Sequence, residues 1–237
     1  MKQKLRSMKI KPNWRKIYFL FAFLAFVSLS FSQDITVTKI AGGGELPSPL
    51  NQDAAASWEV GNPYAMVMTD NGDLYIGDYR WGAYGILKID GATNEITEFM
   101  KEAGESTGDG GPVQKATTND GIYGMALDCD GNIYFSDQSS GVVRKIDMTT
   151  GYVSLVAGNY GSGDVIDGAL ATETPLGTPA GITFNDDCSK MWIADYADHY
   201  VYEVDMNTGI LNIIAGTGDR AEAGDGILAI NSGFKNP

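Results

Sequence analysis

The segment Asp130-Gly-Asn-Ile-Tyr-Phe-Ser-Asp137 decides the fold, because its pattern occurs three times in the 237-residue chain. The other copies end at Asp78 and Asp195, so the closing aspartates lie 59 and 58 residues apart. Two further markers keep the same spacing: Leu87-Lys-Ile-Asp90, Arg144-Lys-Ile-Asp147 and Tyr202-Glu-Val-Asp205, and the Asp-Gly pairs at Asp109, Asp167 and Asp225. Three independent markers with one spacing indicate an internal repeat of about 58 residues.

Each repeat contains four short apolar segments separated by turn residues. In the middle copy these segments span 122–127, 133–137, 142–147 and 152–157, with Asp-Gly and Thr-Gly pairs between them. This pattern predicts antiparallel hairpins. Consecutive apolar residues in Ile133-Tyr-Phe135 and Met191-Trp-Ile193 are typical of strands buried on both faces. A repeated four-stranded sheet of this kind predicts an all-β propeller, in which each sheet is one blade.

These motifs resemble those of NHL-repeat β-propellers of the secreted bacterial type, and the resemblance covers the chain from residue 33 onward. The residues that carry it are Gly108-Asp-Gly-Gly-Pro112, Asp130–Asp137, Val143-Arg-Lys-Ile-Asp147, Thr150-Gly151 and Val156-Ala-Gly158. The resemblance implies four-stranded blades around a central channel, usually six in a ring. The Asn-x-Arg often found between the second and third strands is replaced by Ser-Ser-Gly-Val-Val-Arg144 and Asp198-His-Tyr-Val-Tyr202.

The first 32 residues have the pattern of a secretory signal peptide. Seven basic residues precede an uncharged run over residues 17–27, and Ser30-x-Ser32 fits the rule for cleavage after Ser32. The alternative is a membrane anchor, but the apolar run is shorter than the roughly 17 residues that span a bilayer. We therefore expect a propeller domain over residues 33–237, located outside the cell, in the periplasm or at the cell surface, and not held in a membrane after cleavage.

The repeats do not make up a complete ring in this chain. The segment Ile35–Gly42 matches the fourth strand of a repeat without its first three, which predicts a strand that closes the last blade. Asn236-Pro237 aligns with Thr178-Pro179, directly before a new first strand. Because a closed propeller needs about four blades or more, we expect three full blades and a closing strand from a six-bladed ring, with the chain stopping at a blade boundary.

The charge of the chain excludes several classes of partner. The net charge is −13, and removal of the basic first sixteen residues leaves 10 basic against 30 acidic residues. A surface with a net charge of about −20 repels nucleic acid and anionic lipid.

Recurrence in every blade favours a structural role for Asp78, Asp137 and Asp195, as acceptors of backbone N–H groups in the turns that follow them. Asp90, Asp147 and Asp205 are expected to open the turns between the third and fourth strands by the same chemistry.

The long connections between blades, over residues 104–121, 158–180 and 216–237, are the candidate binding surface. We expect them around the mouth of the channel, where their acidic residues would suit a basic partner or a cation such as calcium. The alternative is an acidic surface that serves only solubility. The candidate ligand-binding residues are Glu105, Asp109, Asp164, Asp167, Glu222 and Asp225.

The sequence favours a non-enzymatic binding protein. His199 is the only histidine, and neither a Gly-x-Ser-x-Gly motif nor a phosphate-binding loop occurs. No cofactor is predicted. The main hypothesis is an exported scaffold that presents its connections to a protein, peptide or glycan. The alternative is a metal-dependent lyase or hydrolase whose metal ligands lie in blades outside this chain.

Cys129 and Cys188 occupy equivalent turns of adjacent repeats, between the first and second strands. Export into an oxidising compartment and convergence of blades toward the channel would allow a disulfide between them. The alternative is that both serve as small core residues.

Overall fold

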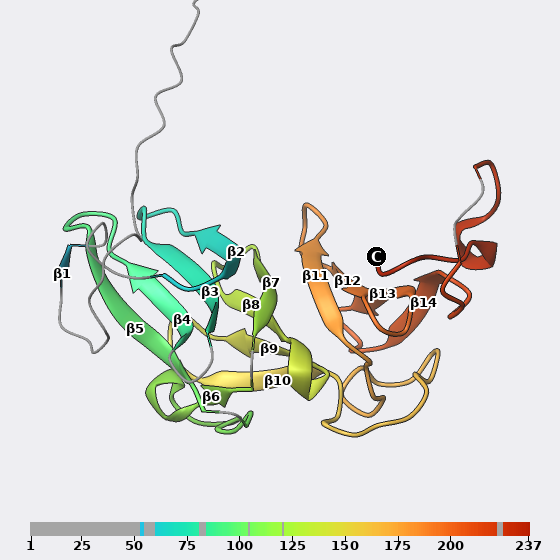
Figure 1. Ribbon diagram of the computed structural model, residues 1–237, viewed down its shortest axis with the longest axis horizontal. Coiled ribbons are helices and arrows are strands. Elements are labelled where there is room, and N and C mark those ends of the chain that lie inside the picture. The colour runs from blue at the N-terminus through green and yellow to red at the C-terminus, as the bar shows by residue number, and fades with distance from the viewer. Residues whose placement is uncertain (1–52, 55–59, 81–83, 104, 120, 222–224) are drawn as a thin grey trace, which may run out of the picture. The chain divides into compact units, whose positions relative to one another are not determined.

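A computed structural model of the chain describes residues 53–54, 60–80, 84–103, 105–119, 121–221 and 225–237 (Figure 1). In these ranges the regular structure is β-sheet, apart from three single-turn 3₁₀ helices: η2 (Val113–Lys115), η3 (Gln138–Ser140) and η4 (Ala229–Asn231). The described residues contain no helix with the length and apolar character needed to cross a membrane. The expected signal peptide and the strand over residues 35–42 lie outside the described residues.

The described strands form three sheets, and each contains four antiparallel strands joined in chain order. The first sheet has two short additions on β5, β1 (Asp53–Ala54) and β6 (Thr117–Thr118). The predicted all-β fold built from propeller blades is confirmed. The four strands of each sheet are β2 (Pro63–Met68), β3 (Leu74–Arg80), β4 (Tyr84–Ile89) and β5 (Glu95–Glu102); β7 (Ile122–Leu127), β8 (Ile133–Asp137), β9 (Val142–Ile146) and β10 (Val153–Ala157); β11 (Pro179–Phe184), β12 (Lys190–Asp195), β13 (Tyr200–Asp205) and β14 (Leu211–Ala215).

The turn between the third and fourth strands is built in the same way in all three sheets. One carboxylate oxygen, Oδ1, accepts the backbone N–H groups two and three residues later at 2.8–2.9 Å. These bonds hold the pKa of each aspartate below its usual range. The expected role of these aspartates is therefore what the structure shows, and the three residues are Asp90, Asp147 and Asp205.

The aspartate at or near the end of the second strand also accepts backbone N–H groups, but mainly from a different segment than expected. Asp78, Asp137 and Asp195 bond residues 17 or 18 positions earlier, just before the first strand of the same sheet, at 2.8–3.3 Å. Asp195 also accepts the backbone N–H groups of Ala197 and Asp198 in the turn that follows it. A buried carboxylate can accept several bonds, and here it joins the entry of the sheet to the end of its second strand.

The core lies between neighbouring sheets. One cluster combines Tyr75 and Ile86 of the first sheet with Phe135 and Ile146 of the second. A second cluster joins residues of the second sheet, including Val143, to residues of the third. All five residues of β8 are buried, as predicted, whereas β12 alternates between buried and half-buried positions.

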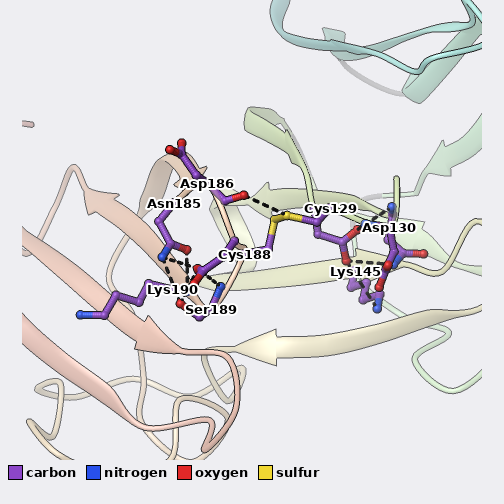
Figure 2. The surroundings of a disulfide bond; sticks show 11 residues. Cys129, Asp130, Lys145, Asn185, Asp186, Cys188, Ser189 and Lys190 are labelled. Atoms are coloured by element: carbon purple, nitrogen blue, oxygen red, sulfur yellow. Dashed lines mark hydrogen bonds and ion pairs between the residues drawn. A yellow bond between two sulfur atoms is a disulfide. The ribbon is translucent and has the colours of Figure 1, made fainter.

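Cys129 and Cys188 form a disulfide, with their Cα atoms 5.9 Å apart (Figure 2). Cys129 lies in the turn between β7 and β8, and Cys188 lies in the turn between β11 and β12. The bond therefore ties equivalent turns of the second and third sheets, the first of the two alternatives left open by the sequence.

Candidate functional site

The connections between sheets lie along the outer strand of the sheet that follows. Gly110 N donates to Val153 O at 2.7 Å, and Val153 N donates to Gly111 O at 2.8 Å. In the next repeat, Gly168 and Ala169 make the corresponding bonds to Leu211. Gly110 and Gly168 have φ angles of +79° and +78°, a left-handed conformation that favours glycine. The Asp-Gly marker is thus the point where each connection pairs with an exposed strand edge.

The structure places two of the candidate residues at the outer edges of the sheets. Asp109 and Asp167 lie beside the outer strands β10 and β14. The physical reason is that β10 and β14 would otherwise present unpaired N–H and C=O groups at the sheet edge.

Arg144 on β9 organises the first connection, residues 105–119. Its side chain is fully buried, and its guanidinium forms an ion pair of 2.8 Å with Asp109. The same group donates to the carbonyl oxygens of Thr107 and Thr117 at 2.8 and 2.7 Å, and to Ser106 Oγ at 3.0 Å. A guanidinium carries five donors in a rigid plane, so one side chain fixes four points of an irregular segment.

Asp137 lies beneath this connection with no exposed surface. Ser106 Oγ donates to Asp137 at 2.7 Å, Asn119 N donates at 3.3 Å, and Arg144 lies 3.7 Å away. Burial raises the pKa of Asp137 to about 6, against the opposing effects of Ser106 and Arg144. Asp137 is thus the acceptor around which neighbouring hydroxyl groups orient.

Tyr160, in the second connection (residues 158–178), completes the network. Its hydroxyl donates to Asp109 Oδ2 at 2.5 Å, and burial followed by this bond raises its pKa to about 12. Its φ of +58° is uncommon for a residue with a side chain. Tyr160 remains 43% exposed. Because the hydroxyl is bound to Asp109, the part of Tyr160 available to a ligand is its ring.

These groups surround an open pocket of about 470 Å³, which we call the Tyr160 pocket. Its lining is rich in hydroxyl groups, amide groups and glycine, with Leu176 as its aliphatic member. The lining residues are Glu105, Ser106, Asn119, Ser139, Ser140, Gly141, Tyr160, Gly161, Ser162, Leu176 and Gly177. Both connections and the turn between β8 and β9 therefore contribute to one concave surface.

The third sheet has a smaller pocket, of about 250 Å³, lined by Asp164, Asp198 and Tyr200 among others. Tyr202 takes the strand position of Arg144, and its hydroxyl donates to Asp198 Oδ2 at 3.2 Å. Burial, with the nearby charge of Asp195, raises the pKa of Asp198. Among the side chains that the structure describes, no guanidinium donates to the second connection.

The structure separates the six candidate residues predicted from the sequence. Glu105 and Asp164 line different pockets, and Asp109 bonds Arg144 and Tyr160 beside the first pocket. Asp167 accepts the backbone N–H of Ile213 at 2.7 Å. Asp225 is exposed in a turn, and Glu222 lies outside the described residues.

Arg144, Tyr160 and the buried Asp137 were not identified as site residues from the sequence. A signal was present, because Leu87, Arg144 and Tyr202 occupy equivalent positions and differ completely in chemistry. Over the ranges that the structure describes, no group of three or more His, Cys, Asp or Glu residues is placed to hold a metal ion.

Comparisons with known proteins support the fold. No protein-family model matches the chain, and no curated protein matches it. A structural genomics protein of unknown function from Bacteroides thetaiotaomicron is similar to it, with 25% identity and a TM-score of 0.58, over 75% of this chain and 41% of that protein. The chain thus spans less than half the length of that protein.

Weaker likenesses extend to two other solved structures. Virginiamycin B lyase from Staphylococcus aureus has 15% identity and a TM-score of 0.42, over 65% of this chain and 41% of the lyase. An auxiliary nutrient binding protein from Bacteroides ovatus has 16% identity and a TM-score of 0.43, over 74% and 52% of the two chains.

Proposed function

We propose that the chain is part of an exported NHL-type propeller that binds a protein, peptide or glycan through the connections beside its second sheet. The observation that carries this proposal is the set of bonds made by the buried Arg144. Arg144 holds the first connection directly, and its partner Asp109 holds Tyr160 beside the open Tyr160 pocket.

The arrangement favours binding because the loops are ordered before a ligand arrives. Ordering flexible side chains and loops on association costs free energy, about 0.5–1.5 kcal/mol for each immobilised side chain. Arg144 and Asp109 already fix the backbone at Thr107 and Thr117 and the side chain of Tyr160. A binding site gains affinity when its contact groups are held by a supporting set of buried bonds.

The electrostatics select against anionic ligands. The chain carries a net charge of −13, and Glu105 is the charged side chain in the lining of the pocket. An uncharged or basic group therefore fits better than a phosphate, sulfate or carboxylate.

The test compares the wild-type protein with Tyr160→Ala on an array of oligosaccharides and an array of peptides. Tyr196→Ala is the matched control, because Tyr196 is a 49% exposed tyrosine that lines neither pocket. We expect a probe that binds the wild type and Tyr196→Ala equally and binds Tyr160→Ala at least tenfold more weakly. Absence of any bound probe, or binding that does not depend on Tyr160, would overturn the proposal.

A further inference from the structure

We infer that the ligand of the Tyr160 pocket is a neutral carbohydrate, with Tyr160 stacking on a sugar ring and the serines around Asp137 accepting bonds from its hydroxyl groups. This inference rests on the proposed function and names the ligand class of the same site.

The lining of the Tyr160 pocket is mostly polar. Sites for drug-like molecules are mostly apolar, with a few polar groups that set orientation. In the Tyr160 pocket the proportion is reversed, because Ser106, Ser139, Ser140, Ser162 and Asn119 contribute polar groups beside one tyrosine and one leucine. A ligand that loses its water here must itself be polar over most of its surface.

The hydrogen bonds beneath the pocket point toward Asp137. Ser106 Oγ donates its proton to Asp137 at 2.7 Å, and Ser139 and Ser140 lie beside it in the lining of the pocket. A hydroxyl whose proton points inward toward a carboxylate offers its lone pairs to other partners. Ser106 uses one of these lone pairs for Arg144, at 3.0 Å. Together with the carboxylate of Glu105, these serines make the pocket rich in acceptors, which suits a ligand rich in O–H donors.

Tyr160 is the one aromatic residue in the lining of the pocket. A tyrosine whose hydroxyl is bound to Asp109 presents its apolar ring to the pocket. A sugar ring has an apolar C–H face and a rim of hydroxyl groups, so it can contact this ring and the acceptors at once.

An ammonium group is the main competing ligand, since it is also a donor and would be attracted by Glu105. A lysine side chain, however, is long and narrow and would leave most of a pocket of about 470 Å³ filled with water. We therefore place the peptide as the alternative outcome of the test.

The test is isothermal titration of the full chain with neutral gluco-, manno- and xylo-oligosaccharides, with a sulfated oligosaccharide and a lysine-rich peptide as comparison probes. We expect binding of at least one neutral oligosaccharide and none of the sulfated one. Tyr160→Phe keeps the ring and should stay within about fivefold of wild type, whereas Tyr160→Ala should lose at least tenfold.

A second variant distinguishes loss of binding from misfolding of Tyr160→Ala. Ser162 is exposed at the pocket and takes part in no bond that holds the network, so Ser162→Trp should fill the pocket, abolish binding and leave the melting temperature unchanged. If the peptide binds in a Tyr160-dependent way and no saccharide does, the inference fails and the proposed function stands. If neither class binds, or if binding survives both Tyr160→Ala and Ser162→Trp, both fail.

Discussion

The second and third sheets share the hydrogen bonds that build their turns and edges. They differ in how a side chain of the sheet bonds the connection beside it. Each has an aspartate at the end of its second strand, an aspartate in its last turn and an Asp-Gly pair on its outer edge. At one strand position, however, the second sheet has Arg144 and the third has Tyr202. Arg144 reaches across to Asp109 and the backbone of the first connection, whereas the hydroxyl of Tyr202 donates to Asp198 in its own sheet.

In a repeat protein, a binding site can arise at a position where one repeat differs from the others. The aspartates and the Asp-Gly pair recur because every sheet needs the turns and the edge pairing that they form. A side chain that breaks the repeat, with its charge fully buried, must be compensated by specific partners. Here those partners are the loop that lines the Tyr160 pocket and the aspartate that holds Tyr160.

We expect the largest loss of stability from a substitution at Arg144, the strand position at which the two sheets differ. Arg144→Met should lower the free energy of unfolding by about 5 kcal/mol, because Asp109 and the buried Asp137 lose their cation. Tyr202→Phe, the matched change in the third sheet, removes one hydrogen bond and should cost about 1 kcal/mol. Chemical denaturation measures both, and equal losses would contradict the account.

The disulfide is the next largest contribution, and it joins the two sheets that differ. Cys129 and Cys188 are 59 residues apart, and a closed loop of that length stabilises the folded state by about 4 kcal/mol in the chain-entropy model. The double variant Cys129→Ser/Cys188→Ser should lose that amount by denaturation under oxidising conditions. Under reducing conditions, the wild type should match the variant.

The pH dependence of stability separates a buried aspartate from one in a turn. The folded-state pKa of Asp137 is about 6, above its unfolded value of 3.8, so its contribution is fully present below pH 4 and is lost as the pH rises through 6. The stability of wild type relative to Asp137→Asn should therefore fall by about 2–3 kcal/mol between pH 4 and pH 7. Asp147, whose pKa is lowered, should show the opposite sign against Asp147→Asn, since its contribution is lost as the pH falls below about 4.

The smallest effects should be the same in every sheet. Asp90→Ala, Asp147→Ala and Asp205→Ala each remove a carboxylate that accepts two turn N–H groups. We expect similar falls in melting temperature, of roughly 2–4 °C each. A much larger fall for one of them would show that the shared devices are not equivalent.

The strands and turns were predictable from the sequence because their signals are local. Asp130-Gly131 and Thr150-Gly151 mark turns within a few residues of the strands that they join, and β7 and β8 begin and end where expected. The Tyr160 pocket was not predictable in this way. Arg144 and Asp109 lie 35 residues apart, and Tyr160 and Asp109 lie 51 apart, so no local spacing brings them together.

The acidic residues chosen from the sequence also show that charge and loop position alone do not identify a site residue. Glu105 was placed at a binding surface from its charge and loop position, and it lines the Tyr160 pocket. Asp167 has the same properties in the sequence, yet it bonds the backbone of Ile213. Charge in a loop does not distinguish a residue that faces a ligand from one that holds a strand edge.

Hydrogen exchange followed by mass spectrometry on wild type and Arg144→Met tests whether Arg144 orders the first connection around the Tyr160 pocket. We expect faster amide exchange over residues 105–119 and around Tyr160, with no change over residues 165–178, to which no described arginine side chain donates. A uniform increase over both connections, or no increase over residues 105–119, would contradict it.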